Sequence, residues 1–349
     1  SSEVLTEFYG LQQRAQLARS QYQTLLSRSQ DLQAQASLQL PDSRVVSPAL
    51  PPATPSSPNT RMNLILGTIA GLILGIGIAF LYENFIGGFT SEQQAEAVLR
   101  RRVTSIVPKL RGSSDGSPAD QIADAPLSLF AEAIRRIRAG FDQAVPSMPG
   151  GALVVMVTSA LPSEGKSTVA LSLARAYASA GKRTLLIDGD LRKPSLHRLV
   201  NMQLKVGLLD FLQSDSRTFE QEIIQKDPRS NAVMLLGARR SNIPTDQIVS
   251  DANFGGLVDM ARRSFDVVVI DTSPLVPVVD GLYIAKLVDA AVFVVRWGST
   301  RQQDAKAALT SLEGVLHDKP LTVVLNQQEV SKSNYQQRYG AYYVENPST

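Results

Sequence analysis

The chain begins with a helical pattern of apolar residues. Leu11, Ala15, Ala18, Tyr22, Leu25, Ser29, Leu32 and Ala36 recur at spacings of four and three. This heptad seam predicts a helix over residues 1–40 with coiled-coil character. Six prolines follow within residues 41–60. Because proline has no N–H and disfavours helix, this stretch is either a semi-rigid polyproline strut or a disordered linker.

An uncharged run, MNLILGTIAGLILGIGIAFLY, separates Arg61 from Glu83. At 1.5 Å per residue it can cross a hydrocarbon core of about 30 Å, so residues 61–84 are predicted to form a transmembrane helix. It is no signal peptide, because about sixty residues precede it. One face carries Gly67, Gly71 and Gly75, which either allow close helix association or reflect the general abundance of Gly in membrane helices.

Basic residues are concentrated after the span. The nearest ones downstream are Arg100, Arg101, Arg102, Lys109 and Arg111, whereas few precede it. The positive-inside rule therefore places the C-terminal part in the cytoplasm and the first sixty residues on the other side.

Beyond the membrane, residues 85–125 are predicted to be a juxtamembrane linker with one short helix, capped by Ser91 and Gln94 and ending near Arg102. A soluble domain is expected over 126–326. It contains six apolar, β-branched runs, LVVMVTS, RTLLIDGD, AVMLLGA, DVVVIDTS, AAVFVVR and LTVVLN, separated by helical stretches. Such runs are typical of strands buried on both faces, so we expect an α/β fold with a doubly wound, mostly parallel sheet.

Composition narrows the possible chemistry. Apolar residues make up 44% of the 349 residues, which supports a real core. The chain has no Cys and two His, so disulfides, thiol catalysis and Cys-based or His-rich metal sites are excluded. A net charge of +3 gives no support for nucleic-acid binding.

The first strand of this domain leads into a phosphate-binding loop. The loop runs from Ala160 to Thr168 with the sequence ALPSEGKST, and a helical stretch follows. Its backbone N–H groups, including those of Ser163, Glu164 and Gly165, are predicted to cradle the phosphates of ATP. Lys166 would neutralise the β and γ groups, and Ser167 would ligate Mg²⁺. Ala160 replaces the first glycine of the usual motif.

Acidic residues end two further strands. Asp188 and Asp190 follow the second strand of the domain, and Asp271 ends a later one. Ligands of parallel sheets bind at the carboxyl ends of the strands, so we expect these carboxylates to converge. Together with Ser167 they can hold Mg²⁺ and still leave a proton acceptor.

Taken together, A-x4-GKS, the stretch Asp188-Gly-Asp190-Leu-Arg192 and Asp271-Thr-Ser-Pro resemble the bacterial tyrosine kinases, which are similar to MinD/ParA ATPases. Two further features fit this family: an E-x2-R-x2-R helix and a C-terminal segment, 327–349, that contains four tyrosines. The Pro-rich segment and Gly-rich span also resemble the end of a Wzz-like polysaccharide co-polymerase, whose earlier parts are not in this chain.

The resemblance implies a role for each matching residue. Lys166, Asp188, Asp190 and Arg192 would be catalytic, with Asp188 as acceptor of the tyrosine proton, although Asp188 and Asp190 could exchange roles. Asn326 would contact the adenine. Ring assembly would use Glu132, Arg135 and Arg138, and the phosphate acceptors would be Tyr335, Tyr339, Tyr342 and Tyr343.

The activity implied is that of a membrane-anchored, non-specific protein-tyrosine kinase. It would transfer the γ-phosphoryl group of ATP to the tail of a neighbouring subunit and control synthesis and export of an exo- or capsular polysaccharide. By resemblance it sits in the bacterial inner membrane, with its N-terminal segment in the periplasm, as a ring-shaped homo-oligomer, an octamer in the family. Partners would be a polysaccharide polymerase, an outer-membrane exporter and a tyrosine phosphatase.

Two other functions remain open from the sequence. One is a MinD/ParA-like ATPase switch, although Leu161 stands where that class usually has a signature lysine. The other is a membrane scaffold in which nucleotide only holds the ring together.

Overall fold

The computed structural model describes residues 2–38, 57–85, 87–110, 116–145, 151–213, 223–237, 244–250 and 252–329. The chain divides into two compact units, Ser1–Gly71 and Leu72–Thr349. In the first unit, α1 spans Ser2–Leu38 with its described side chains exposed. This confirms the expected N-terminal helix, while its pairing in a coiled coil stays a prediction. Most of the Pro-rich segment expected at 41–60 lies outside the described residues.

The predicted membrane-spanning run forms helix α2, Thr60–Phe85. Its Thr60–Leu81 segment has a mean hydropathy of 2.5, and none of it is buried within the protein, so it is long and apolar enough to cross a membrane. A Cβ added at Gly67, Gly71 or Gly75 would meet no other atom within 4 Å. Nothing that the structure describes therefore requires these glycines, and helix association stays a prediction.

The second unit contains an eight-stranded sheet in the order β1-β8-β7-β2-β6-β3-β5-β4. Every pair is parallel except β4 with β5. The strands are β1 Val103–Pro108, β2 Leu153–Ser159, β3 Thr184–Asp188, β4 Ile224–Lys226, β5 Val233–Leu235, β6 Val267–Asp271, β7 Ala290–Arg296 and β8 Leu321–Gln328. The six strands expected from the apolar runs are all present.

Successive residues of the central strands enter two different cores. In β2, Val154 and Met156 belong to one cluster, whereas Val155 and Val157 belong to the other. The same alternation holds in β6, β7 and β8. Because both faces of the sheet are buried, these strands need apolar residues at every position, which explains their uninterrupted apolar sequences.

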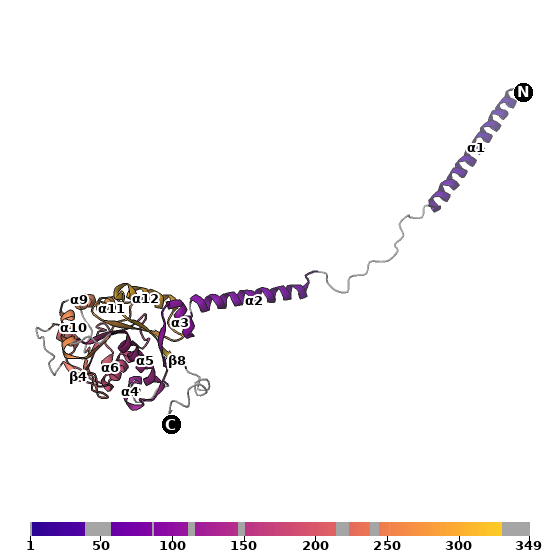
Figure 1. Ribbon diagram of the computed structural model, residues 1–349. Coiled ribbons are helices and arrows are strands. Elements are labelled where there is room, and N and C mark those ends of the chain that lie inside the picture. Colours follow the sequence, from indigo (N-terminus) through magenta and orange to yellow (C-terminus); the bar gives the residue numbers. More distant parts are fainter. Residues whose placement is uncertain are drawn as a thin grey trace. The chain divides into compact units, whose positions relative to one another are not determined.

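Helices cover both faces of the sheet (Figure 1). One core is closed by η1 Pro118–Asp120, α4 Gln121–Asp124, α5 Leu129–Ala144, α6 Lys166–Ser179 and α7 Leu196–Leu199. The other is closed by α3 Glu92–Leu99, α8 Leu208–Gln213, α9 Thr245–Ser250, α10 Ala252–Ser264, α11 Asp280–Ala285 and α12 Gln302–Leu316. This arrangement confirms the expected doubly wound α/β domain.

The domain begins well before Pro126, contrary to the expectation of a linker over 85–125. Within that range, β1 pairs with β8 along its length, and α3 packs on β1 and α12. The helix capped by Ser91 is correct, since its side chain accepts the N–H of Gln94, but the chain continues into an edge strand. Phe89 is fully buried, so the core already includes this segment.

The polar stretch after β1 also belongs to the domain. Ser117 and Asp120 form a reciprocal capping box around η1. Asp120 then contacts the Arg175 guanidinium at 2.6 Å, and Asp227 binds the same group through two bonds of 2.8 Å. Arg175 is only 1% exposed. This buried fork ties α6, the helix that follows the phosphate-binding loop, to η1 and to the β4–β5 hairpin.

Candidate active site

The phosphate-binding loop joins β2 to α6 and is braced from behind by Asn326. Gly165 has φ +92°, and an added Cβ would lie 2.0 Å from Asn326 Nδ2. Only glycine satisfies both conditions. The buried Asn326 amide donates to the Glu164 carbonyl oxygen at 2.8 Å. Asn326, expected to contact adenine, thus holds the loop in shape, and its contact with the base stays a prediction.

The Glu164 side chain is part of the loop's own framework. It is 2% exposed, accepts the Leu161 N–H at 2.7 Å, and accepts the hydroxyl of Thr300. Burial raises the pKa of the Glu164 carboxyl. On the outer side, Ser163 has φ +66° and its carbonyl faces Arg296 Nη1 at 3.5 Å. The Glu164 side chain is occupied by these contacts and its carbonyl oxygen by Asn326, so Glu164 can contribute its backbone N–H group to a phosphate.

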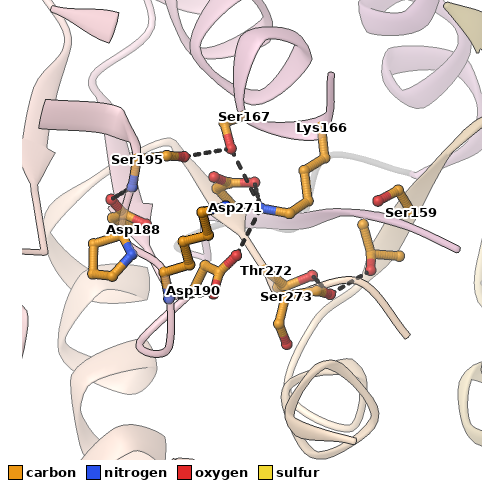
Figure 2. A network of polar contacts seen from close by, with 12 residues as sticks. Ser159, Lys166, Ser167, Asp188, Asp190, Ser195, Asp271, Thr272 and Ser273 are labelled. Carbon is orange, nitrogen blue, oxygen red and sulfur yellow. Dashed lines mark hydrogen bonds and ion pairs between the residues drawn. The ribbon is translucent and has the colours of Figure 1, made fainter. Parts of the chain in front are cut away.

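Lys166 lies among the acidic groups at the carboxyl ends of β3 and β6 (Figure 2). Its Nζ is 2.9 Å from Asp190 Oδ2, 3.6 Å from Asp271 Oδ1 and 3.4 Å from Ser167 Oγ. Burial lowers the pKa of Lys166, but the carboxylates of Asp271 and Asp190 outweigh it, so the net pKa is raised. The ammonium is therefore charged and already engaged before nucleotide arrives.

Asp188 and Asp271 are neighbours in the parallel register of β3 and β6, and both are fully buried. Burial, then the charge of Asp271, raises the pKa of Asp188 to about 8. Burial likewise raises the pKa of Asp271 despite the opposing effect of Lys166. Asp188 Oδ2 accepts the N–H groups of Ser195 and Leu196, both at 3.1 Å. Within the described ranges, Asp188 Oδ1 and both Asp271 oxygens have no hydrogen bond, although Asp271 Oδ1 forms the ion pair with Lys166.

The unsatisfied oxygens suit a magnesium ion. They lie at the end of the sheet where Ser167 Oγ, 2.9 Å from Ser195 Oγ, is also found. In the described part of the chain no cluster of three or more His, Asp or Glu side chains could hold a metal alone. Mg²⁺ in nucleotide sites usually takes one or two protein oxygens and completes its shell with phosphate and water. The residues present therefore fit this ion.

The remaining predicted residues occupy different places. Ala160 is buried at the start of the loop, and Thr168 lies in the first turn of α6. The guanidinium of Arg192 is half-exposed and turned to Thr245 and Asp280. The four tail tyrosines, Tyr335, Tyr339, Tyr342 and Tyr343, lie outside the described residues, which end at 329.

The proposed ring-assembly residues lie on α5, apart from this site. Glu132 pairs with Arg135 on its own helix, Oε2 to Nη2 at 2.7 Å. Arg138 donates to the Ala176 carbonyl at 2.7 Å and lies 3.9 Å from Asp142. Glu132 and Arg135 are each about one-third exposed, so pairing with another subunit would require an exchange of partners.

Three residues at the site were not identified from the sequence: Ser195, Thr300 and Asp280. Thr300 follows β7 at the same sheet edge as the acidic residues, so its place after an apolar strand was an available signal. Ser195 and Asp280 have a weaker signal, because they lie seven and nine residues beyond β3 and β6, whereas Thr300 lies four residues beyond β7.

The fold and this site define a P-loop nucleotide-binding domain of the MinD/ParA class. The family of CobQ/CobB/MinD/ParA nucleotide-binding domains matches residues 155–341, and the GNVR family of G-rich domains matches residues 6–84. Among solved structures, the chimerical protein CapA2B2 covers 69% of the chain with a TM-score of 0.61 and 28% identity. The kinase domain of Escherichia coli ETK gives 0.61 at 22% identity, which supports the fold alone.

Relatives known from their sequences narrow the class. The tyrosine-protein kinase YwqD of Bacillus subtilis is 33% identical over 62% of this chain and 88% of its own length. The succinoglycan biosynthesis transport protein ExoP of Rhizobium meliloti is 31% identical over the whole of this chain. The chain belongs to the bacterial tyrosine kinase family. It spans about half the length of ExoP, 49%, and 42% of the AmsA protein of Erwinia amylovora.

Proposed function

We propose that this chain is a membrane-anchored tyrosine autokinase that transfers the γ-phosphoryl group of ATP to Tyr335, Tyr339, Tyr342 and Tyr343 of a neighbouring subunit. The observation that carries the proposal is the meeting of Lys166 with the buried carboxylates of Asp190 and Asp271 beside the phosphate-binding loop, with Asp188 next to Asp271 in the sheet. The choice of tyrosine as the phosphate acceptor is supported by the similarity to the tyrosine-protein kinase YwqD.

In the proposed reaction a tail phenol oxygen forms a bond to the γ-phosphorus while the bond to the β,γ-bridging oxygen breaks, releasing ADP. The loop N–H groups and Lys166 stabilise the charge on the phosphates. The phenolic proton passes to a carboxylate, and Asp188, which ends β3 beside Asp271, is our first choice by family resemblance. Asp190 is the alternative, because its Oδ2 is freed when Lys166 moves to the phosphates.

A bound Mg²⁺ would supply positive charge for the β- and γ-phosphates. Ser167 and Asp271 would hold it, with Asp188 or Asp190 orienting its water ligands. Lys166 must then leave Asp190 and Asp271 for the phosphates, so the contacts of 2.9 Å and 3.6 Å describe the nucleotide-free arrangement.

The chain would work as a ring in the bacterial inner membrane, with α1 in the periplasm and the kinase domain in the cytoplasm. Support comes from the apolar α2 and from the basic residues that follow it. Glu132, Arg135 and Arg138 would join neighbouring subunits, as an octamer by family resemblance. The similarity to ExoP, a succinoglycan biosynthesis transport protein, supports a role in polysaccharide synthesis and export, with a polymerase, an outer-membrane exporter and a phosphatase as partners.

The test uses the full chain in detergent, incubated with ATP and Mg²⁺ and blotted for phosphotyrosine. Wild type should label strongly, whereas Lys166→Met and the variant with Phe at all four tail positions should not. Tyr283→Phe is the matched control, because Tyr283 is a partly exposed tyrosine of the kinase domain. Mixing Lys166→Met with the four-Phe variant should restore labelling on the Lys166→Met chain if transfer occurs between subunits.

ATP hydrolysis without phosphotyrosine would favour the ATPase switch. Nucleotide binding with neither product would favour a scaffold. Equal labelling of the four-Phe variant and wild type would mean that the tail is not the acceptor.

A further inference from the structure

A further buried carboxylate lies near the site and has no part in the proposed reaction. Asp280, the first residue of α11, is 1% exposed, and neither of its oxygens has a hydrogen bond with a residue that the structure describes. Its charged neighbour is Arg192, whose Nε lies 3.5 Å from Asp280 Oδ2. A buried carboxylate without hydrogen bonds is unfavourable unless a charge compensates it. Asp280 therefore strongly favours a guanidinium held at this position.

Among the described residues, Arg192 is held through its Nε. The same Nε donates to Thr245 Oγ1 at 2.8 Å, and Thr245 is 3% exposed. Neither terminal nitrogen of Arg192 has a hydrogen bond with any residue that the structure describes. The side chain is 47% exposed. The guanidinium is thus anchored on one side and keeps two donor groups for another acceptor.

The segment that leads from Asp271 to Asp280 is attached to the phosphate-binding loop. The segment after Asp271 is pinned to the phosphate-binding loop, because the N–H groups of Leu275 and Val276 donate to the carbonyls of Ser159 and Ala160 at 2.9 and 3.1 Å.

Asp280 and Arg192 each lie within two residues of a position held by a close contact: Gly281 for Asp280 and Asp190 for Arg192. A Cβ at Gly281 would lie 2.7 Å from Leu275 Cδ2, so the start of α11 packs tightly on this segment. Arg192 lies two residues after Asp190, whose Oδ1 accepts the N–H of Lys193 at 3.0 Å.

We propose that Asp280, with Thr245, is a positioning residue that orients Arg192 so that its terminal nitrogens bind the phosphoryl group during transfer. The proposal rests on the proposed kinase activity and adds a role for Asp280. An arginine with two free donors matches a phosphoryl group bidentately, and such contacts contribute mainly in the transition state. A purely structural role is the competing explanation, since a carboxylate in the first turn stabilises a helix.

The experiment compares Asp280→Asn, Arg192→Gln and the double variant as full chains in detergent. The kcat and KM for ATP are measured by tail phosphorylation, nucleotide affinity with a fluorescent ATP analogue, and unfolding from the fluorescence of Trp297, the chain's one tryptophan. Asp280→Asn should lower kcat about 10-fold or more with little change in KM for ATP. The double variant should lose no more than Arg192→Gln alone, because both act through one group.

Two further variants separate positioning from helix stability. Thr245→Ser keeps the hydroxyl and should retain wild-type kcat, whereas Thr245→Val should lose part of it. Asp304→Asn removes a carboxylate from the first turn of α12 and should leave kcat unchanged.

A wild-type kcat in Asp280→Asn, or multiplicative losses in the double variant, would overturn the proposal while leaving the kinase intact. The proposal would also be overturned if Asp280→Asn changed the stability of the protein without changing kcat. Absence of phosphotyrosine from wild type would overturn the kinase activity and this inference with it.

Discussion

Replacing Lys166 by Met removes the cation that two buried carboxylates share. Its Nζ lies 2.9 Å from Asp190 and 3.6 Å from Asp271, and the three side chains are 9%, 6% and 0% exposed. The usual expectation for a phosphate-binding lysine is loss of activity with an unchanged fold. This geometry predicts a loss of stability as well, because the variant would leave both carboxylates without a counter-charge.

The distances set the size of the effect. At an effective dielectric constant of about 20, the attractions at 2.9 and 3.6 Å are about 6 and about 5 kcal/mol. Burial of the ammonium opposes this by several kcal/mol, and the raised pKa of Asp271 reduces its charge near neutrality. Removing one partner of a buried pair costs about 3–5 kcal/mol. We expect the lower end, about 3 kcal/mol, for unfolding of nucleotide-free protein at pH 7.5.

Urea unfolding of the full chain in detergent, followed by Trp297 fluorescence, measures this loss. At pH 5 the loss should shrink to about 1 kcal/mol, because burial raises the pKa of Asp271 and this carboxylate can bind a proton once the lysine is gone. Lys193→Met is the control: Lys193 is an exposed lysine of the loop after β3 that carries Asp190, and its replacement should change stability by less than about 0.5 kcal/mol. A Lys166→Met variant as stable as wild type at pH 7.5, or an equal loss at both pH values, would refute the reasoning.

Three other changes have defined outcomes. The pKa of Asp188 is raised to about 8 from 3.8, so the wild type loses stability as pH rises from about 4 through 8. In the same unfolding assay, Asp188→Asn should therefore be more stable than wild type by about 1–3 kcal/mol at pH 8 but not at pH 4. Gly165→Ala should weaken ATP binding at least 10-fold by equilibrium titration, because its Cβ would lie 2.0 Å from an amide nitrogen; unchanged affinity would contradict the loop geometry. Changing Glu132, Arg135 and Arg138 to Ala together should reduce particle mass by light scattering, and an unchanged mass would assign the helix no role in assembly.

The strands and the phosphate site were predictable because each leaves a local pattern. Buried parallel strands need apolar residues on both faces, and the loop needs Gly165 and Lys166 at fixed spacing. The meeting of Asp188 with Asp271 followed from one rule, that parallel strands end at the same edge of a sheet.

What escaped prediction depends on contacts distant in sequence. Strand β1 follows three arginines and alternates buried with partly or fully exposed residues, so its sequence, VTSIVP, lacks the uninterrupted apolar run that marks the central strands. Asp120 belongs to a Ser, Asp and Gly stretch, and only the folded chain brings it to Arg175. The partner of Asp280 is likewise set by tertiary packing.

The pairing of β1 with β8 has a practical consequence for making a soluble fragment. A fragment beginning at Pro126 would lack β1, and the N–H and C=O groups of β8 would form an open edge that invites association with other chains. A Cβ at Gly88 would lie 2.4 Å from the backbone of Gly298, and the carbonyl of Phe89 accepts a hydrogen bond from the N–H of Gly298. The first residue of a well-behaved fragment is therefore near Gly87, where α2 has ended and this packing has not yet begun.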